Sequence, residues 1–278
     1  MNLFRTREGA IADDDVKTQL TTMGSQTTPG ALLVPGSATH LKAIHVAAVA
    51  SNEGAAQSAY MVRLEGPGIE RGMFNCAAGA DGGAVVTGGI ALTKAQRIPV
   101  NIKVTPGQEI LIFGEALGAD QGTYQMGVTL EFGSEAGKEG EIVGEVTVEG
   151  DITSVDTLTR LTTQGSVNAP SRLTPPDATL LKRIVYAVAF DAAADGEVSF
   201  HLRVSGDAVK GGEQVITLGA GSFIDVQSGS DSGRGVMSAV VLDDLDIEIS
   251  PNETLDLSLE MAGVDIGTAT GVITAIFA

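Results

Sequence analysis

Hydrophobic and polar residues alternate along this chain in short runs that predict β-strands. In the run Y-M-V-R-L at 60–64, Tyr60, Val62 and Leu64 share one face, and the two residues between them share the other. A two-residue period built from aromatic and β-branched residues is typical of a strand with one buried face. Apolar residues do not recur at helical spacing over any long stretch. The pattern therefore predicts an all-β protein.

Turn signals separate the expected strands. The run 97–114 contains a strand, the turn Pro106-Gly107 and a second strand, which predicts a hairpin or an arch. Residues 66–89 are rich in Gly and Ala, and we expect them to form long connections between strands. Residues 1–7 carry two arginines and predict either a frayed terminus or an arm that docks on a neighbour.

The sequence of the first half recurs in the second half. Residues 8–25, E-G-A-I-A-D-D-D-V-K-T-Q-L-T-T-M-G-S, match residues 149–166, E-G-D-I-T-S-V-D-T-L-T-R-L-T-T-Q-G-S, at an offset of 141. The offset becomes 140 and later 145, and such steps are changes in loop length, which folded domains tolerate. We expect these pairs to occupy equivalent core positions: Leu41/Leu181, Ile44/Ile184, Val62/Leu202 and Phe132/Phe277.

A repeat of this length indicates a duplicated domain, because solenoid repeats are much shorter. We predict a first jelly roll at 1–133, with the N-terminal arm 1–7, a Gly/Glu-rich linker at 134–148, and a second jelly roll at 149–278. Copies of about 120 residues with closely spaced turn signals favour eight-stranded jelly rolls. An immunoglobulin-like sandwich is the alternative, although the chain lacks Trp and a Cys pair.

Composition narrows the classes of partner. The formal net charge is −18 and the pI is about 4.4, which disfavours direct binding to nucleic acid and to an anionic membrane surface. The single cysteine, Cys76, cannot form an intrachain disulfide, and we expect it to be inert. The N-terminal residues do not resemble a signal peptide. We therefore expect a soluble protein made in the cytoplasm.

The histidines do not form a catalytic or metal-binding pattern. His40, His45 and His201 are separated in sequence, and none has a histidine at its matched position in the other copy. Metal enzymes with a jelly-roll fold need clustered histidines and a carboxylate. Neither H-E-x-x-H nor G-x-S-x-G occurs. We predict no catalytic residue, no metal site and no cofactor, so the protein is not expected to be an enzyme.

Two sets of charged residues could still mark contacts. Asp244, Asp246 and Glu248 would share one face of a strand, about 6.8 Å apart, which is too far for one Ca²⁺ ion without a loop. A solvated face is the favoured interpretation. Arg63 and Arg203 are a matched pair that could form subunit contacts, and we favour a solvated outer face for them as well. Among bound ions, the sequence leaves only Ca²⁺ at subunit contacts as an alternative.

The duplicated β-sandwiches in one disulfide-free chain resemble the double jelly-roll major capsid proteins of tailless icosahedral viruses of bacteria or archaea. The resemblance implies a homotrimer whose six jelly rolls form a pseudo-hexagonal capsomer. It further implies a structural role in the virion after assembly in the host cytoplasm, with other capsid or penton proteins and an internal viral membrane as partners. The alternative is a paired β-sandwich that binds glycans or serves surface adhesion. Sugar-binding surfaces use exposed Trp and Tyr, so the absence of Trp and the presence of only three Tyr disfavour this alternative.

Overall fold

The computed structural model describes residues 2–11, 14–50, 58–81, 95–118, 124–137, 140–192, 196–223, 233–263 and 268–278. Every regular element in these ranges is a β-strand, which confirms the all-β prediction. They contain no helix that is long and apolar enough to cross a membrane.

The first half is an eight-stranded jelly roll. Its strands are β1 (Leu3–Ile11), β2 (Thr18–Gln19), β3 (His40–Ala50), β4 (Ser58–Glu65), β5 (Met73–Asp81), β6 (Gln96–Lys103), β7 (Leu111–Gly118) and β8 (Tyr124–Gly133). They form two antiparallel sheets with the orders β1-β8-β3-β6 and β2-β7-β4-β5. Successive strands alternate between the sheets in the manner of a jelly roll, except that β4 and β5 pair with each other in one sheet. Because β6 and β7 lie in different sheets, the run 97–114 is an arch.

The second half repeats this topology. Its strands are β9 (Gly144–Ile152), β10 (Thr159–Arg160), β11 (Leu180–Ala192), β12 (Gly196–Ser205), β13 (Gln214–Phe223), β14 (Gly233–Leu242), β15 (Ile247–Glu248), β16 (Asp256–Gly263) and β17 (Ala269–Phe277). The sheet orders are β14-β11-β17-β9, to which β15 adds beside β11, and β10-β16-β12-β13. Strand β9 begins within the expected linker, at Gly144.

Strand register confirms the expected core pairs. Leu41 lies opposite Phe132, and Leu181 lies opposite Phe277, at the same place in the two copies. Both pairs of strands carry a register shift one residue further on, and all four side chains are fully buried. The other expected pairs, Ile44/Ile184 and Val62/Leu202, are fully buried too. The duplication therefore extends to backbone hydrogen bonding.

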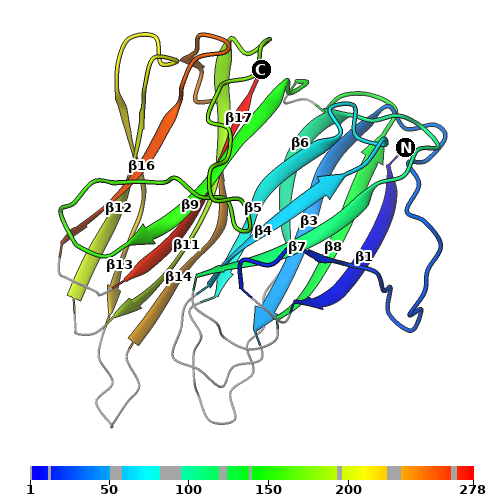
Figure 1. The fold of residues 1–278 in the computed structure, drawn as a ribbon, viewed down its shortest axis with the longest axis horizontal. Coiled ribbons are helices and arrows are strands. Elements are labelled where there is room, and N and C mark those ends of the chain that lie inside the picture. Colours follow the sequence, from blue (N-terminus) through cyan, green and yellow to red (C-terminus); the bar gives the residue numbers. More distant parts are fainter. Residues whose placement is uncertain are drawn as a thin grey trace.

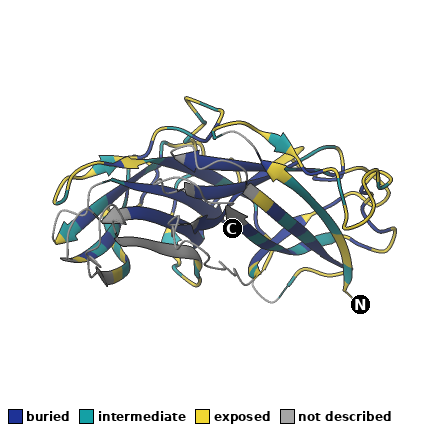
Figure 2. Cartoon of the chain, turned by 90° about the horizontal axis from the view of Figure 1, so that it is seen from below, coloured by how far each residue is buried: buried dark blue, intermediate teal, exposed yellow. Residues whose placement is uncertain are grey.

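The four sheets lie one after another across the molecule (Figure 1). From left to right they are β10-β16-β12-β13, β14-β11-β17-β9, β2-β7-β4-β5 and β1-β8-β3-β6. Buried residues fill the inner strands, while exposed residues follow the loops and the outermost strands (Figure 2). Each half therefore turns one sheet toward the other half and one sheet outward.

Two segments differ from the sequence-based expectation. Residues 3–7 belong to β1 and pair with β8, so they are neither frayed nor an arm. Within the Gly/Ala-rich stretch 66–89, residues 73–81 form β5 and not a connection; residues 82–89 lie outside the described ranges. Strand β5 lacks β-branched residues, and its small central residues Cys76, Ala77 and Ala78 are buried.

The acidic stretch 243–249 is not a continuous strand, so its predicted acidic face is wrong. Asp244 and Asp246 have φ angles of 56° and 48°, in the left-handed region. Only Ile247 and Glu248 are extended. Asp246 instead forms an ion pair with Lys182. Ile98 and Ile102 of β6 correspond to Leu242 and Ile247, so the second copy has one residue more in this segment than the first. The irregular backbone accommodates the extra residue.

Candidate functional site

The predicted chemical candidates are not brought together. His40 Nε2 lies 3.6 Å from Glu141 Oε2, and His45 Nε2 lies 3.0 Å from Glu131 Oε2, so each ring faces a carboxyl group. His201 is in the other half, where it contacts hydroxyl groups. Among the described residues, no group of three His, Cys, Asp or Glu side chains converges on one point.

Cys76 lies on β5 with its thiol fully buried. Burial raises the pKa of this thiol far above its usual range, and the nearby Glu145 carboxylate adds to the shift. The thiol therefore stays protonated near neutral pH, and a protonated thiol is a poor nucleophile. This environment agrees with the expected inert cysteine.

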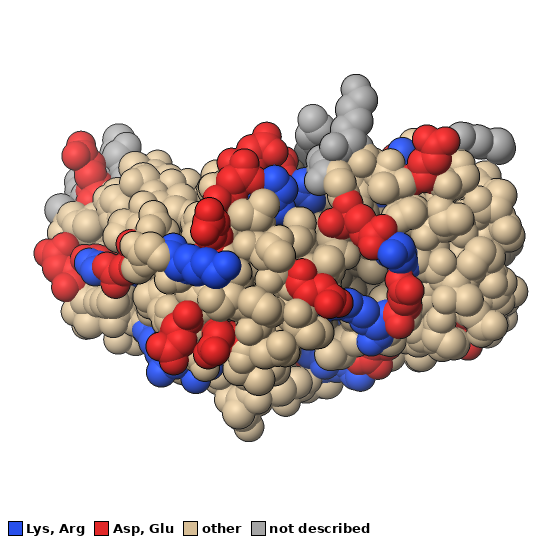
Figure 3. All heavy atoms as spheres, turned by 90° about the horizontal axis from the view of Figure 1, so that it is seen from above, with Lys and Arg blue, Asp and Glu red and all other residues tan. Residues whose placement is uncertain are grey.

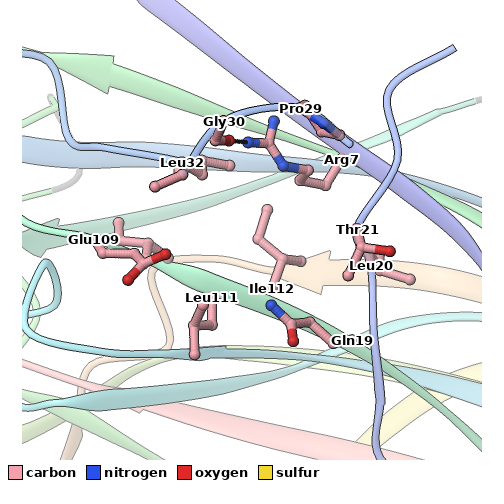
Figure 4. Close-up of a pocket in the computed structure, with 12 residues that line it drawn as sticks. Arg7, Gln19, Leu20, Thr21, Pro29, Gly30, Leu32, Glu109, Leu111 and Ile112 are labelled. Atoms are coloured by element: carbon pink, nitrogen blue, oxygen red, sulfur yellow. Dashed lines mark hydrogen bonds between the residues drawn. The ribbon is translucent and has the colours of Figure 1, made fainter. Parts of the chain in front are cut away.

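A shallow pocket opens between β1, β7 and the loop that precedes β3 (Figure 4). Arg7 crosses it and donates a hydrogen bond to the carbonyl oxygen of Gly30 (Figure 4). Glu109 stands on the opposite wall, and the rest of the lining includes Leu20, Leu32 and Ile112. The lining side chains provide no nucleophile with an adjacent base, so the pocket does not form a catalytic arrangement.

The two halves of the chain pack against each other through a contact that we call the internal contact. It joins two sheets, β2-β7-β4-β5 and β14-β11-β17-β9, through the face of each that points away from the core of its own sandwich. Its apolar part includes Val185, Ala187, Val272 and Ile276 of the second half, which pack into one cluster with the core of the first half. The two halves are therefore held together by burial of apolar area.

An ion pair lies buried within the internal contact. Arg63 is 3.2 Å from Glu115, and only 7% and 1% of their side chains are exposed. The second half supplies a further donor, because the backbone N–H of Ser166 donates to the same carboxylate. The prediction of a solvated face for Arg63 is therefore wrong. Alternation revealed which face the arginine occupies, but not that another sandwich covers it.

Side chains of the second half also satisfy the open edge of β5. Thr274 Oγ1 accepts a hydrogen bond of 2.8 Å from the N–H of Ala77. Thr147 donates to the carbonyl oxygen of Asn75 over 3.3 Å, and the two threonine hydroxyls are 2.9 Å apart. The N–H of Asn75 donates to Glu145 over 3.0 Å. An edge strand needs such partners when it is buried.

Burial raises the pKa values of carboxyl groups in the internal contact. Loss of water raises the pKa of Glu145 to about 7, although the Asn75 N–H and the charge of Arg71 oppose the shift. Burial also raises the pKa of Asp15 and of Glu149, and the charges on neighbouring carboxylates add to both shifts. All three pKa values are therefore shifted upward, and burial is the largest cause of each shift.

The remaining sheet faces point away from the internal contact. The first outer face belongs to β1-β8-β3-β6, and the second outer face belongs to β10-β16-β12-β13. On the second, Arg203 and Glu260 are 3.1 Å apart, close to the 3.2 Å between their counterparts Arg63 and Glu115, but 33% and 22% of their side chains are exposed. The same ion pair is thus covered in one half and open in the other.

The first outer face carries a polar cluster around one carboxylate. Glu131 accepts hydrogen bonds from Asn2 and Arg97, and His45 bonds to it as well. Partial burial raises the pKa of Glu131, but the bonds from Arg97 and His45 outweigh it, and the net shift is downward. Acidic and basic groups are also interspersed at the upper end of the molecule, with uncharged areas between them (Figure 3).

Comparisons with known proteins do not assign a family. No family model and no curated protein matches the chain. Among solved structures, PNGF-II is 13% identical over 98% of this chain, with a TM-score of 0.38, and the chain spans 65% of its length. A CBM22 tandem from Paenibacillus barcinonensis Xyn10C is 10% identical over 99% of this chain and 92% of its own, with a TM-score of 0.24. The exported protein XepA of PBSX is 11% identical over 96% of this chain and 86% of its own, with a TM-score of 0.20. Similarity at this level carries no functional argument.

Proposed function

We propose that the chain is the major capsid protein of an icosahedral virus shell and assembles as a homotrimer of six jelly rolls. The observation that carries this proposal is the unequal use of equivalent faces. The face with Arg63 is covered by the second half, whereas the equivalent face with Arg203 points outward. A chain built in this way retains two unlike faces for neighbours.

The internal contact joins unlike faces of two similar units. Contacts of this head-to-tail kind either close into a ring or continue as a filament. In a ring of three chains, contacts within a chain and contacts between chains would alternate, so six similar units would surround one axis. Such a block has a nearly hexagonal outline and can tile a shell, which fits the resemblance to double jelly-roll capsid proteins.

The acidic composition is compatible with this role. A charge of −18 keeps separate chains apart before assembly and leaves cations as partners for a finished shell. The alternative of a glycan-binding module would use exposed aromatic rings. Tyr60 and Tyr186 are buried, and Phe4 is the only aromatic residue among the exposed large apolar residues in the described ranges.

The test is the mass and outline of the purified protein. Native mass spectrometry should show three chains of 28.4 kDa, about 85 kDa, and negative-stain images should show six-lobed particles. A stable monomer at high micromolar concentration across salt and Ca²⁺ titrations would contradict the proposal. A monomer that also binds on a glycan array would favour the alternative.

A further inference from the structure

The threonine pair that satisfies the edge of β5 has an exact counterpart on the first outer face. Thr6 and Thr129 occupy the positions of Thr147 and Thr274, and their hydroxyls are also 2.9 Å apart. In the second half this pair is buried against β5. In the first half both threonines are partly exposed. The same hydrogen-bonding device is thus present twice, but the described residues show it bound to a strand edge only once.

The matching strand edge is on the second outer face. Strand β13 ends its sheet as β5 does, and both strands pair with their neighbour in the same register, with a shift at the same place. Val215 and Thr217 occupy the positions of Asn75 and Ala77. Their backbone groups are therefore the counterparts of those that Thr147 and Thr274 bind.

A second pair of matching sites lies beside the first. Ser166, whose N–H binds Glu115, follows Gly165 in a tight loop closed by two hydrogen bonds of 2.9 Å between Gln164 and Val167. The loop at Met23 and Gln26 has the same two bonds at 2.9 Å. The φ angles of Gly24 and Gly165 are 54° and 51°.

This equivalence places the N–H of Ser25 on the first outer face, as the counterpart of the Ser166 N–H. On the second outer face, Glu260 is held by Arg203 through one carboxylate oxygen, Oε2. Its counterpart Glu115 uses one oxygen for Arg63 and the other for the serine N–H. Ser25 and Glu260 are therefore complementary groups on opposite sides of the chain.

Exposed apolar side chains mark the same surfaces. Phe4 is 52% exposed and Val215 is 57% exposed. They occupy the positions of Glu145 and Asn75, which touch within the internal contact. A polar pair inside the chain thus corresponds to an apolar pair on the two outer faces, as expected if these faces meet in another molecule.

We propose that the first outer face of one chain binds the second outer face of a second copy and so repeats the internal contact. In this arrangement Thr6 and Thr129 hydrogen-bond the β13 edge, Ser25 donates to Glu260, and Phe4 packs on Val215. The inference specifies the contact between chains and rests on the proposed trimer.

The test uses one substitution on each outer face, Phe4→Asp and Val215→Asp. Each variant alone loses every contact between chains and should run as a monomer of 28.4 kDa by native mass spectrometry. An equimolar mixture retains one intact pair of faces, so it should form a dimer of about 57 kDa and nothing larger. Circular dichroism and thermal melts confirm that each variant is folded.

Leu173→Asp is the matched control. Leu173 is 54% exposed, and its counterpart Leu33 is 46% exposed, so this position lies outside the internal contact in both halves. This variant should remain a trimer. If Phe4→Asp and Val215→Asp also remain trimers, or if their mixture forms no dimer, the inference is overturned while a trimer built in another way survives. A monomeric parent protein overturns the proposed function itself.

Discussion

Substitution of two equivalent glycines isolates the contribution of the internal contact. Gly24 and Gly165 both have positive φ angles, so alanine costs about 1–2 kcal/mol of backbone strain at either position. A Cβ atom at Gly24 would meet nothing within 4 Å. A Cβ atom at Gly165 would come closer than 3.0 Å to three atoms of the Glu115 carboxyl group.

The Glu115 carboxyl group cannot yield easily, because only 1% of its side chain is exposed and it is bonded to Arg63 and Ser166. Overpacking costs about 1–3 kcal/mol, and disrupting a buried ion pair costs about 3–5 kcal/mol. Gly165→Ala should therefore destabilise the chain by about 2–5 kcal/mol more than Gly24→Ala.

The assay is urea unfolding followed by circular dichroism. Both glycine variants are made in Val215→Asp chains, so that contacts between chains do not contribute. The difference between their unfolding midpoints, multiplied by the urea dependence, gives the difference in free energy. Equal losses in the two variants, within about 0.5 kcal/mol, would refute the tight fit of Ser166 and Gly165 over Glu115.

Two further predictions concern groups buried at the internal contact. The pKa of Glu145 is raised from 4.5 to about 7 in the folded chain, so the contribution of this group to stability should be fully present below pH 4.5 and should be lost as the pH rises through 7, by about 3 kcal/mol at most. Glu145→Gln should raise the melting temperature at pH 8 and flatten its dependence on pH between 5 and 8; an unchanged pH profile would contradict the assignment. Cys76 should not react with a thiol reagent in the native protein and should react once urea unfolds it; rapid labelling of the native chain would show that β5 is open.

The fold could be predicted because the duplication preserves the residues that set strand register. Leu41 and Phe132 face each other as Leu181 and Phe277 do, and such apolar pairs stay constrained in both copies. Strand β5 was missed since its residues 75–79 are small and lack β-branching. The second copy carried the missing signal, because its equivalent run Q-V-I-T-L at 214–218 contains three β-branched residues in a row.

The internal contact could not be predicted from either copy alone. Period-2 alternation assigns Arg63 and Arg203 to the same face of equivalent strands, but the chain covers only one of them. The covering residues come from distant segments, such as Ser166 and Thr274. Matched residues do differ at this contact, for example Ala77 against Thr217, but drift on a solvated face produces the same divergence.

If contacts between chains repeat the internal contact and close into a ring, matched positions on the two outer faces must meet in neighbouring chains. Thr129→Cys combined with Thr217→Cys places thiols at the counterparts of Thr274 and Ala77, which are hydrogen-bonded within the chain. These two positions are on the outermost sheets of one chain, so a short bismaleimide can link them only between chains (Figure 1). Covalent dimers and trimers and no larger species are expected on a denaturing gel, and neither substitution alone should give linked chains. Absence of linked chains, or a ladder that continues beyond three chains, would contradict a closed ring of three chains built from this contact.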